Sequence, residues 1–332
     1  MNTGIADIDG KQTFYRLVSL WAICEAFAGG LMHGANIPLT GLVVSSMAVT
    51  CIILIAYHCP KQFSIIRATM IVCIAKLALS PHSPPTAYIA VLFQGLAGQL
   101  LLSGKSQFTY RAALLGILAL VESAIQRILV LLIVFGTEFW KAVNQYIQKL
   151  TGEREYSDYS LKLAVGYIIL HAIVGLLAGL AASRIAKKSI HWKTAHPEWI
   201  LPPIPPVTLP ASKKKKRPGT WKLILMLIWI VLLAAWLWPI DGFLPKTEAF
   251  GILLRSVLIV SGWWLFISPW LMSLFKNRMK KAETSYQSDL AIVMRMIPTT
   301  QHVFARCWEK AKRESPAAPM RMFTKLLMVN LL

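Results

Sequence analysis

Apolar residues along the chain fall into eight long blocks, which are separated by short polar or proline-containing stretches. A helix needs about 20 apolar residues to cross the hydrocarbon core of a bilayer, which is about 30 Å thick. The pattern therefore predicts an all-α polytopic membrane protein. The third block is the weakest because it contains Arg67 and Lys76. The blocks lie near 15–32, 37–57, 63–80, 85–103, 110–136, 161–183, 221–239 and 250–275.

Composition agrees with this prediction. Hydrophobic residues make up 56% of the 332 residues and charged residues only 15%, whereas about a quarter of a soluble domain is charged. The five cysteines have neither zinc-binding spacing nor a pattern typical of a disulfide framework. The N-terminus carries two acids and leads directly into the first block, so we expect no cleavable signal peptide.

The charge of the connecting stretches alternates along the chain. The loops after the second and fourth blocks are basic, whereas those after the first and third carry no charged residue. Residues 184–222 contain ten lysines and arginines against one acid, and residues 276–332 contain eleven against four acids. Basic loops stay in the cytoplasm. The alternation therefore predicts eight crossings of the cell (inner) membrane with both termini in the cytoplasm.

One stretch, GQLLLSGKS (Gly98 to Ser106), comes close to a nucleotide-binding loop. Five residues separate Gly98 from Gly104, however, and the loop requires four. Its leucines belong in lipid, and Lys105 is typical of a lysine at the cytoplasmic end of a span. We therefore expect this chain to bind no ATP and no other cofactor. The spans also lack the HExxH, GxSxG and paired-aspartate signatures, so an intramembrane enzyme is the least favoured reading.

The stretch HPEWILPPIPPVTLPASKKKKRPG divides the sequence. Its prolines favour an extended tether, and the run Lys213–Arg217 favours contact with anionic lipid. It lacks the aromatic or recognition elements that nucleic-acid binding would need. The predicted parts are a six-span bundle over 1–184, a cytoplasmic linker over 185–220, a two-span segment over 221–275 and a basic cytoplasmic tail over 276–332.

Five ionisable residues fall well inside the predicted spans when positions are counted at about 1.5 Å per residue. Such groups are costly in lipid, so we expect most of them to face one another or a wet cavity. Two readings remain open, a structural ion-pair network and a site for a substrate or coupling ion. The residues are Glu25, Lys76, Glu122, Arg127 and His171.

The outer loops add His33, Asn36 and His82, which could line the mouth of a cavity or bind a metal ion of unknown identity. They are more typical of polar turns than of a metal site. Small residues four apart predict close helix contacts, within the bundle or with a further membrane subunit. These ridges comprise Ala22, Ala26 and Gly30 on the first span and Gly175, Gly179 and Ser183 on the sixth.

The tail sequence SDLAIVMRMIPTTQHVFARCWEKAKRES has apolar residues at helical spacing and basic residues between them. It predicts a basic amphipathic helix that lies on the inner membrane surface or binds a cytoplasmic partner. Pro298 should break or kink it. The apolar positions are Val293, Met296, Ile297, Phe304, Cys307, Trp308 and Ala311.

These features resemble an energy-coupling factor transporter, with an S-component-like module fused to a partial T-component-like one. Ala22 and Ala26 match the AxxxA ridge on the first span of S components. Ala305-Arg306-Cys307 is similar to a T-component coupling motif, and Met320-Arg321-Met322 is a poorer match to a second. The T-component-like part has only two spans before these motifs, whereas T components usually have about four.

The resemblance implies that the six-span module binds a vitamin or metal ion. It also implies that separate cytoplasmic ATPase subunits use the ATP and dock on the tail through Arg295, Arg306 and Arg321. The favoured function is thus the membrane subunit of an importer for a small solute. The alternative is a membrane scaffold or assembly subunit, with structural ion pairs in the spans and a tail that docks a soluble partner.

Overall fold

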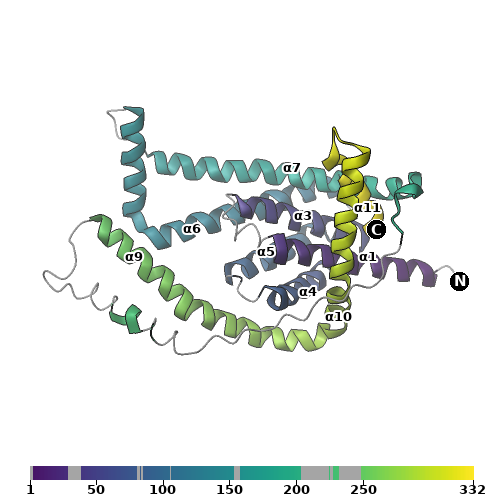
Figure 1. The fold of residues 1–332 in the computed structure, drawn as a ribbon, viewed down its shortest axis with the longest axis horizontal. Helices are drawn as coiled ribbons and strands as arrows, with labels where there is room; N and C mark the ends of the chain where they lie inside the picture. Colours follow the sequence, from purple (N-terminus) through teal and green to yellow (C-terminus); the bar gives the residue numbers. More distant parts are fainter. Residues whose placement is uncertain are drawn as a thin grey trace. The chain divides into compact units, whose positions relative to one another are not determined.

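In the computed structural model, most of the described residues lie in helices (Figure 1). All regular elements among the described residues are helices, which confirms the all-α class. Within the part of the chain that the structure describes, four helices are long and apolar enough to cross a membrane, namely Thr40–His58, Phe108–Thr137, Tyr159–Ala195 and Leu254–Leu274. The described residues are 3–28, 39–80, 83, 85–104, 106–152, 158–202, 224, 227–231 and 248–332.

The chain forms two compact units. The second unit comprises Ala124–Leu170 and Ala211–Arg278. The C-terminal tail belongs to the same unit as the N-terminal helices, because the first unit comprises Met1–Ser123, His171–Pro210 and Met279–Leu332.

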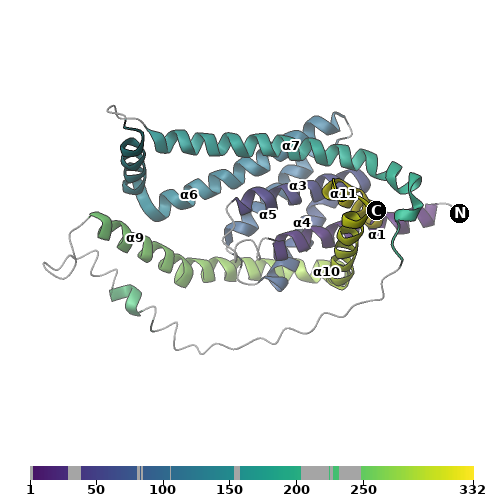
Figure 2. The same cartoon turned by 45° about the horizontal axis from the view of Figure 1, so that its top comes forward.

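A bundle of four helical segments forms the centre of the first unit, as both ribbon views show (Figure 1, Figure 2). Helices that are apolar on every side bury best against one another, and the fully buried side chains here include Leu17, Ile52 and Ile71. The segments are α1 (Thr3–Ile23) with its π-helical extension η1 (Cys24–Ala28), α3 (Thr40–His58), α4 (Ser64–Leu79) and α5 (Pro85–Leu102).

Glycines on α5 let this helix pack closely against its neighbours. A Cβ atom on Gly95 would collide with the side chain of Thr69 on α4. One on Gly98 would reach Cγ2 of Ile52 on α3 at 2.5 Å. Gly98, the first glycine of the stretch that looked like a nucleotide-binding loop, is thus a helix-packing residue. Lys105 lies outside the described residues.

Two long helices, α6 (Phe108–Thr151) and α7 (Tyr159–Ala195), pass through both units. The sequence predicted a loop from residue 137, but α6 continues as helix to Thr151 beyond a non-helical residue, Gly136 (φ 71°, ψ −172°). Glycine adopts this left-handed φ without the penalty that a side chain would impose. Likewise, α7 extends to Ala195, beyond the predicted start of the linker at 185.

The second unit also contains α9 (Glu248–Gly262), the π-helical turn η3 (Trp263–Ile267) and the start of α10 (Ser268–Glu314). Within it, the indole nitrogen of Trp229 donates a hydrogen bond of 2.8 Å to the carbonyl oxygen of Leu258. Of the predicted span 221–239, only residues 224 and 227–231 are described, and these are helical.

The tail comprises the rest of α10 and the short helix α11 (Pro319–Leu331). Pro298 does not break the helix, because α10 continues through this residue. Proline removes one backbone donor from a helix interior. Here the neighbouring Ile297 and Thr300 are buried, and Thr300 shares a hydrogen bond of 2.8 Å with Ser19 of α1. Packing against α1 offsets the lost hydrogen bond.

Four of the predicted apolar positions of the tail pack inside the protein, whereas Phe304 is 42% exposed. Val293, Ile297, Cys307 and Ala311 are fully buried in the chain itself. Part of the cover comes from α11, whose Phe323 ring contacts the rings of Phe304 and Trp308. These buried residues therefore contact the chain itself, and the sequence alone did not show that α11 folds back over them.

Candidate functional site

A buried ion pair joins α4 to the π-helical extension of α1. Lys76 Nζ donates a hydrogen bond of 2.7 Å to Glu25 Oε2, and the two side chains are only 5% and 4% exposed. Lys76 Nζ also lies 5.7 Å from the ring centroid of the buried Tyr88 on α5. Each charge depends on the other here, because water does not reach them. We name this contact the deep pair.

The π-helical turn that carries Glu25 was not foreseen from the sequence. Such turns are rare and occur frequently at functional sites, because the extra residue re-aims the side chains around it. The turn begins at Cys24, directly before Glu25. The local geometry of α1 thus changes at the residue that meets Lys76.

A second ionic contact connects the tail to the same two helices. Arg67 of α4 donates two hydrogen bonds to Asp289 of α10, from Nε to Oδ2 at 2.8 Å and from Nη2 to Oδ1 at 2.7 Å. The hydroxyl of Tyr15 on α1 donates a third bond, of 2.6 Å, to Oδ1. Such two-pronged arginine–carboxylate pairs are among the stronger polar contacts. We name this contact the tail node.

The tail node holds its carboxylate in the charged form. Burial by itself would raise the pKa of Asp289, but the hydrogen bonds from Arg67 and Tyr15 outweigh burial and lower the pKa below its ordinary value. The Asp289 side chain is 8% exposed, whereas that of Arg67 is 45% exposed. Water therefore reaches the tail node from one side only.

The deep pair and the tail node connect the same two helices at different levels. Tyr15 and Glu25 are ten residues apart on α1 and η1, and Arg67 and Lys76 are nine apart on α4. At a rise of about 1.5 Å per residue, the two contacts are about 14 Å apart along the bundle. A displacement of α10 at Asp289 thus acts directly on both helices that carry the deep pair.

Two more of the predicted ionisable residues lie on α6 and α7 of the first unit. His171 is fully buried on α7, and Glu122 is half-buried on α6. The helices are antiparallel and touch where Gly116 meets Gly175, so Glu122 lies within about one turn of the level of His171. Arg127 is exposed and belongs to the second unit. Direct contact is shown for Glu25 and Lys76.

The small-residue ridge on α7 forms a contact within the chain. Cβ atoms on Gly175 and Gly179 would collide with the backbone carbonyl oxygens of Gly116 and Ala112 on α6. Backbones approach this closely in lipid only when side chains are absent. Ser183 at the end of the ridge is fully buried, as is Ala22 on α1. Ala26 is 8% exposed.

Four predicted residues lie outside the described residues. They are His33, Asn36 and His82 of the outer loops and Gly30 of the first ridge. Among the residues that the structure describes, no group of three or more histidine, cysteine, aspartate or glutamate side chains could hold a metal ion.

The three arginines proposed for coupling are all exposed, and they do not share one site. Arg295 lies on the outer face of α10. Arg306 lines an open depression of about 410 Å³ beside Leu201 and Pro202. Arg321 lines another of about 330 Å³, which we name the α7–α11 depression.

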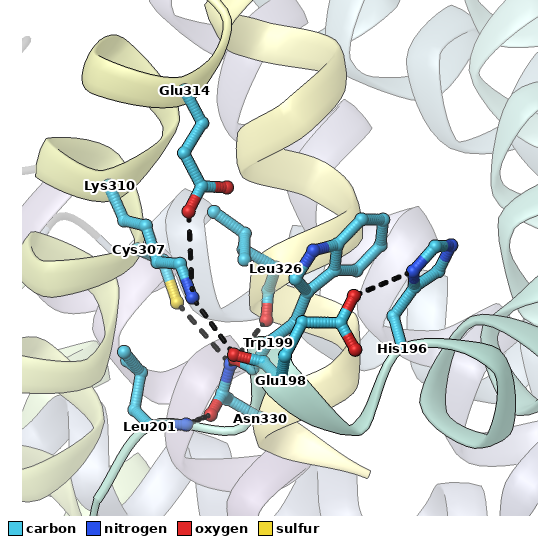
Figure 3. Close-up of polar contacts among 9 residues, drawn as sticks. All are labelled: His196, Glu198, Trp199, Leu201, Cys307, Lys310, Glu314, Leu326 and Asn330. Atoms are coloured by element: carbon cyan, nitrogen blue, oxygen red, sulfur yellow. Dashed lines mark hydrogen bonds and ion pairs between the residues drawn. The ribbon is translucent and has the colours of Figure 1, made fainter.

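A polar anchor fixes the chain after α7 to the tail, as Figure 3 shows. Asn330 Nδ2 donates to the carbonyl oxygen of Trp199 at 3.0 Å, and the backbone nitrogen of Leu201 donates to Asn330 Oδ1 at 2.7 Å. Lys310 Nζ donates to the carbonyl oxygen of Glu198 at 3.1 Å. The sequence held one signal for this anchor, since Asn330 is the single asparagine in the apolar run MFTKLLMVNLL.

The pKa values of two groups near the anchor are shifted in opposite directions. A backbone hydrogen bond and the bond with His196 lower the pKa of the Glu198 carboxyl. Burial raises the pKa of Cys307 to about 11, against the opposing charge of Lys310. Cys307 is therefore a protonated packing residue at neutral pH, and a thiolate function at this position is disfavoured.

No family model, curated protein or solved structure matches the chain.

Proposed function

We propose that the chain is the membrane subunit of an ATP-driven importer for a small solute, of the energy-coupling factor type. In this proposal a six-span module binds a vitamin or metal ion, and both termini lie in the cytoplasm. The tail couples the module to separate ATPase subunits. The observation that supports it is the tail node, because Asp289 holds the same two helices that carry Glu25 and Lys76.

The deep pair suits a coupling element because its energy depends steeply on distance. Two opposite charges in a medium of low dielectric constant attract far more strongly than in water. A small displacement of α1 relative to α4 therefore changes the energy of the pair substantially. In the proposed cycle, ATPase motion reaches α10, passes through Asp289 to α1 and α4, and alters the solute site near the deep pair.

The exposed arginines of the tail suit contact with acidic surfaces of the ATPases. A guanidinium group binds carboxylates through two parallel hydrogen bonds, which makes it a good interface residue. Arg306 is exposed within the larger depression, beside the segment that Asn330 anchors. We assign Arg306 the principal role, and Arg295 and Arg321 supporting ones.

The test is co-purification of the tagged chain with ATPase subunits from native membranes. Arg306→Glu should abolish both ATPase association and solute uptake, and it should leave solute binding intact. The matched control is Lys162→Glu, which reverses an exposed charge in the second unit and should leave association unchanged. Failure of the unaltered chain to associate with any ATPase would refute the proposal.

The deep burial of Glu25 and Lys76 also favours a second candidate, a membrane scaffold whose ion pairs are structural. A thermal-shift screen against vitamins, divalent metal ions and nucleobases separates the two candidates. A specific shift supports the importer, and no shift with any compound supports the scaffold. The scaffold also predicts that Glu122→Gln lowers stability without any effect on transport.

A further inference from the structure

The α7–α11 depression is lined by one face of each of two helices. Ile185, Lys188 and Trp192 lie at helical spacing on α7. The face of α11 contributes Arg321, Thr324 and Lys325. The depression has a volume of about 330 Å³ and belongs entirely to the first unit.

All charged residues that line this depression are basic. Three of its six lining residues are cationic and none is acidic. Lys325 Nζ lies 5.9 Å from the ring centroid of Trp199, an aromatic contact that neutralises no charge. Three cations around one hollow repel one another unless an anion lies between them. The chemistry fits a ligand with several negatively charged oxygens, which is a phosphate group.

The depression lies at the end of a membrane-spanning helix. α7 is one of the four helices that are long and apolar enough to cross a membrane. The apolar run of α7 ends near Ser183, and Lys188 follows within about two helical turns. Trp192 adds the residue type that is enriched at the level of the lipid headgroups. Phospholipid headgroups supply phosphate groups at this level of a bilayer.

We propose that the α7–α11 depression binds the phosphate headgroup of an anionic phospholipid such as phosphatidylglycerol. Lys188 holds the phosphate from α7, and Arg321 and Lys325 hold it from α11. The acyl chains extend along the apolar part of α7, beginning at Ile185. The bound lipid ties the C-terminal helix to the membrane, whether or not the protein transports a solute.

The test is native mass spectrometry of the full chain in mild detergent, titrated with phosphatidylglycerol or phosphatidylcholine. The unaltered protein should retain phosphatidylglycerol in preference. A basic residue near an anionic surface contributes about fivefold in affinity. The triple variant Lys188→Gln, Arg321→Gln, Lys325→Gln should therefore lose on the order of a hundredfold.

The matched control removes three exposed charges from α10 in the variant Arg295→Gln, Lys312→Gln, Arg313→Gln, and should change affinity less than about twofold. Equal losses in both triple variants would overturn the proposal, since binding would then follow net charge alone. Displacement of the lipid by millimolar inorganic phosphate at constant ionic strength would overturn it in favour of a free-anion site. If the triple variant misfolds, the single variant Arg321→Gln, at an exposed position, should still show the fivefold loss.

Discussion

The deep pair and the tail node connect the same helices, yet they lie in very different surroundings. Both side chains of the deep pair are almost fully buried. In the tail node, Arg67 is 45% exposed and a tyrosine shares the carboxylate. A buried pair is costly to break because its charges have no water to turn to, whereas a partly exposed pair exchanges its partner for water at moderate cost.

This difference in burial indicates that the two contacts differ in how easily they separate. Because water can replace part of the Arg67 contact, the tail node costs less to separate than the deep pair. The deep pair cannot open without a replacement charge. A charged solute or coupling ion would provide one, and a scaffold would never need it. Substitutions in each contact should therefore change stability by amounts that follow its burial.

The largest effect is expected for Lys76→Met, which leaves Glu25 buried without its cation. Removal of one partner from a buried pair costs about 3–5 kcal/mol. The measurement is the free energy of unfolding in detergent. The double variant Glu25→Met, Lys76→Met should recover most of the loss, because no unpaired charge remains. A double variant as unstable as the single one would contradict the role of the charges.

A smaller loss is expected for Asp289→Asn, which weakens the tail node. Hydrogen bonds to a charged group contribute about 1.5–3 kcal/mol each, and the exposure of Arg67 reduces this because water replaces part of the contact. We expect a total loss of about 1–2 kcal/mol by the same unfolding measurement. Glu309→Gln, an exposed change on the same helix, is the control and should have little effect.

The smallest effect is the acid dependence of the tail node. The pKa of Asp289 is lower in the folded protein than its ordinary value of about 3.9. The stabilisation is therefore complete above about pH 4 and is lost as the pH falls through the lowered pKa. The stability difference between the unaltered protein and Asp289→Asn should be constant from about pH 8 to 5 and shrink below about pH 4. A difference that shrinks already at about pH 6 would mean that another group controls the node.

The sequence predicted the apolar helices well because each depends on local composition. The block 37–57 corresponds closely to α3, and the block 63–80 to α4. The contact between Glu25 and Lys76 followed the prediction that buried charges face one another, since depth can be counted along a helix. The limits of α6 were harder, because a kink at Gly136 and a loop there have similar sequences.

The tail node could not be predicted from local patterns. Asp289 lies in a polar stretch, and Arg67 in the sequence is equally typical of a basic residue near a membrane surface. Their pairing depends on how the tail folds back over α1, and no spacing rule relates residues so far apart. The α7–α11 depression is similar, because its two faces come from helices that meet only in the folded chain.

The hydroxyl of Tyr15 donates a hydrogen bond to Asp289, which lies 274 residues further along the chain and is synthesised much later. At a synthesis rate of about 5–20 residues per second, about 14–55 s pass between the synthesis of Tyr15 and that of Asp289. Thr13, whose hydroxyl donates to the carbonyl oxygen of Leu332 at 3.1 Å, waits longer still. The contacts of α1 within the first unit are therefore complete only after residue 332 has been synthesised.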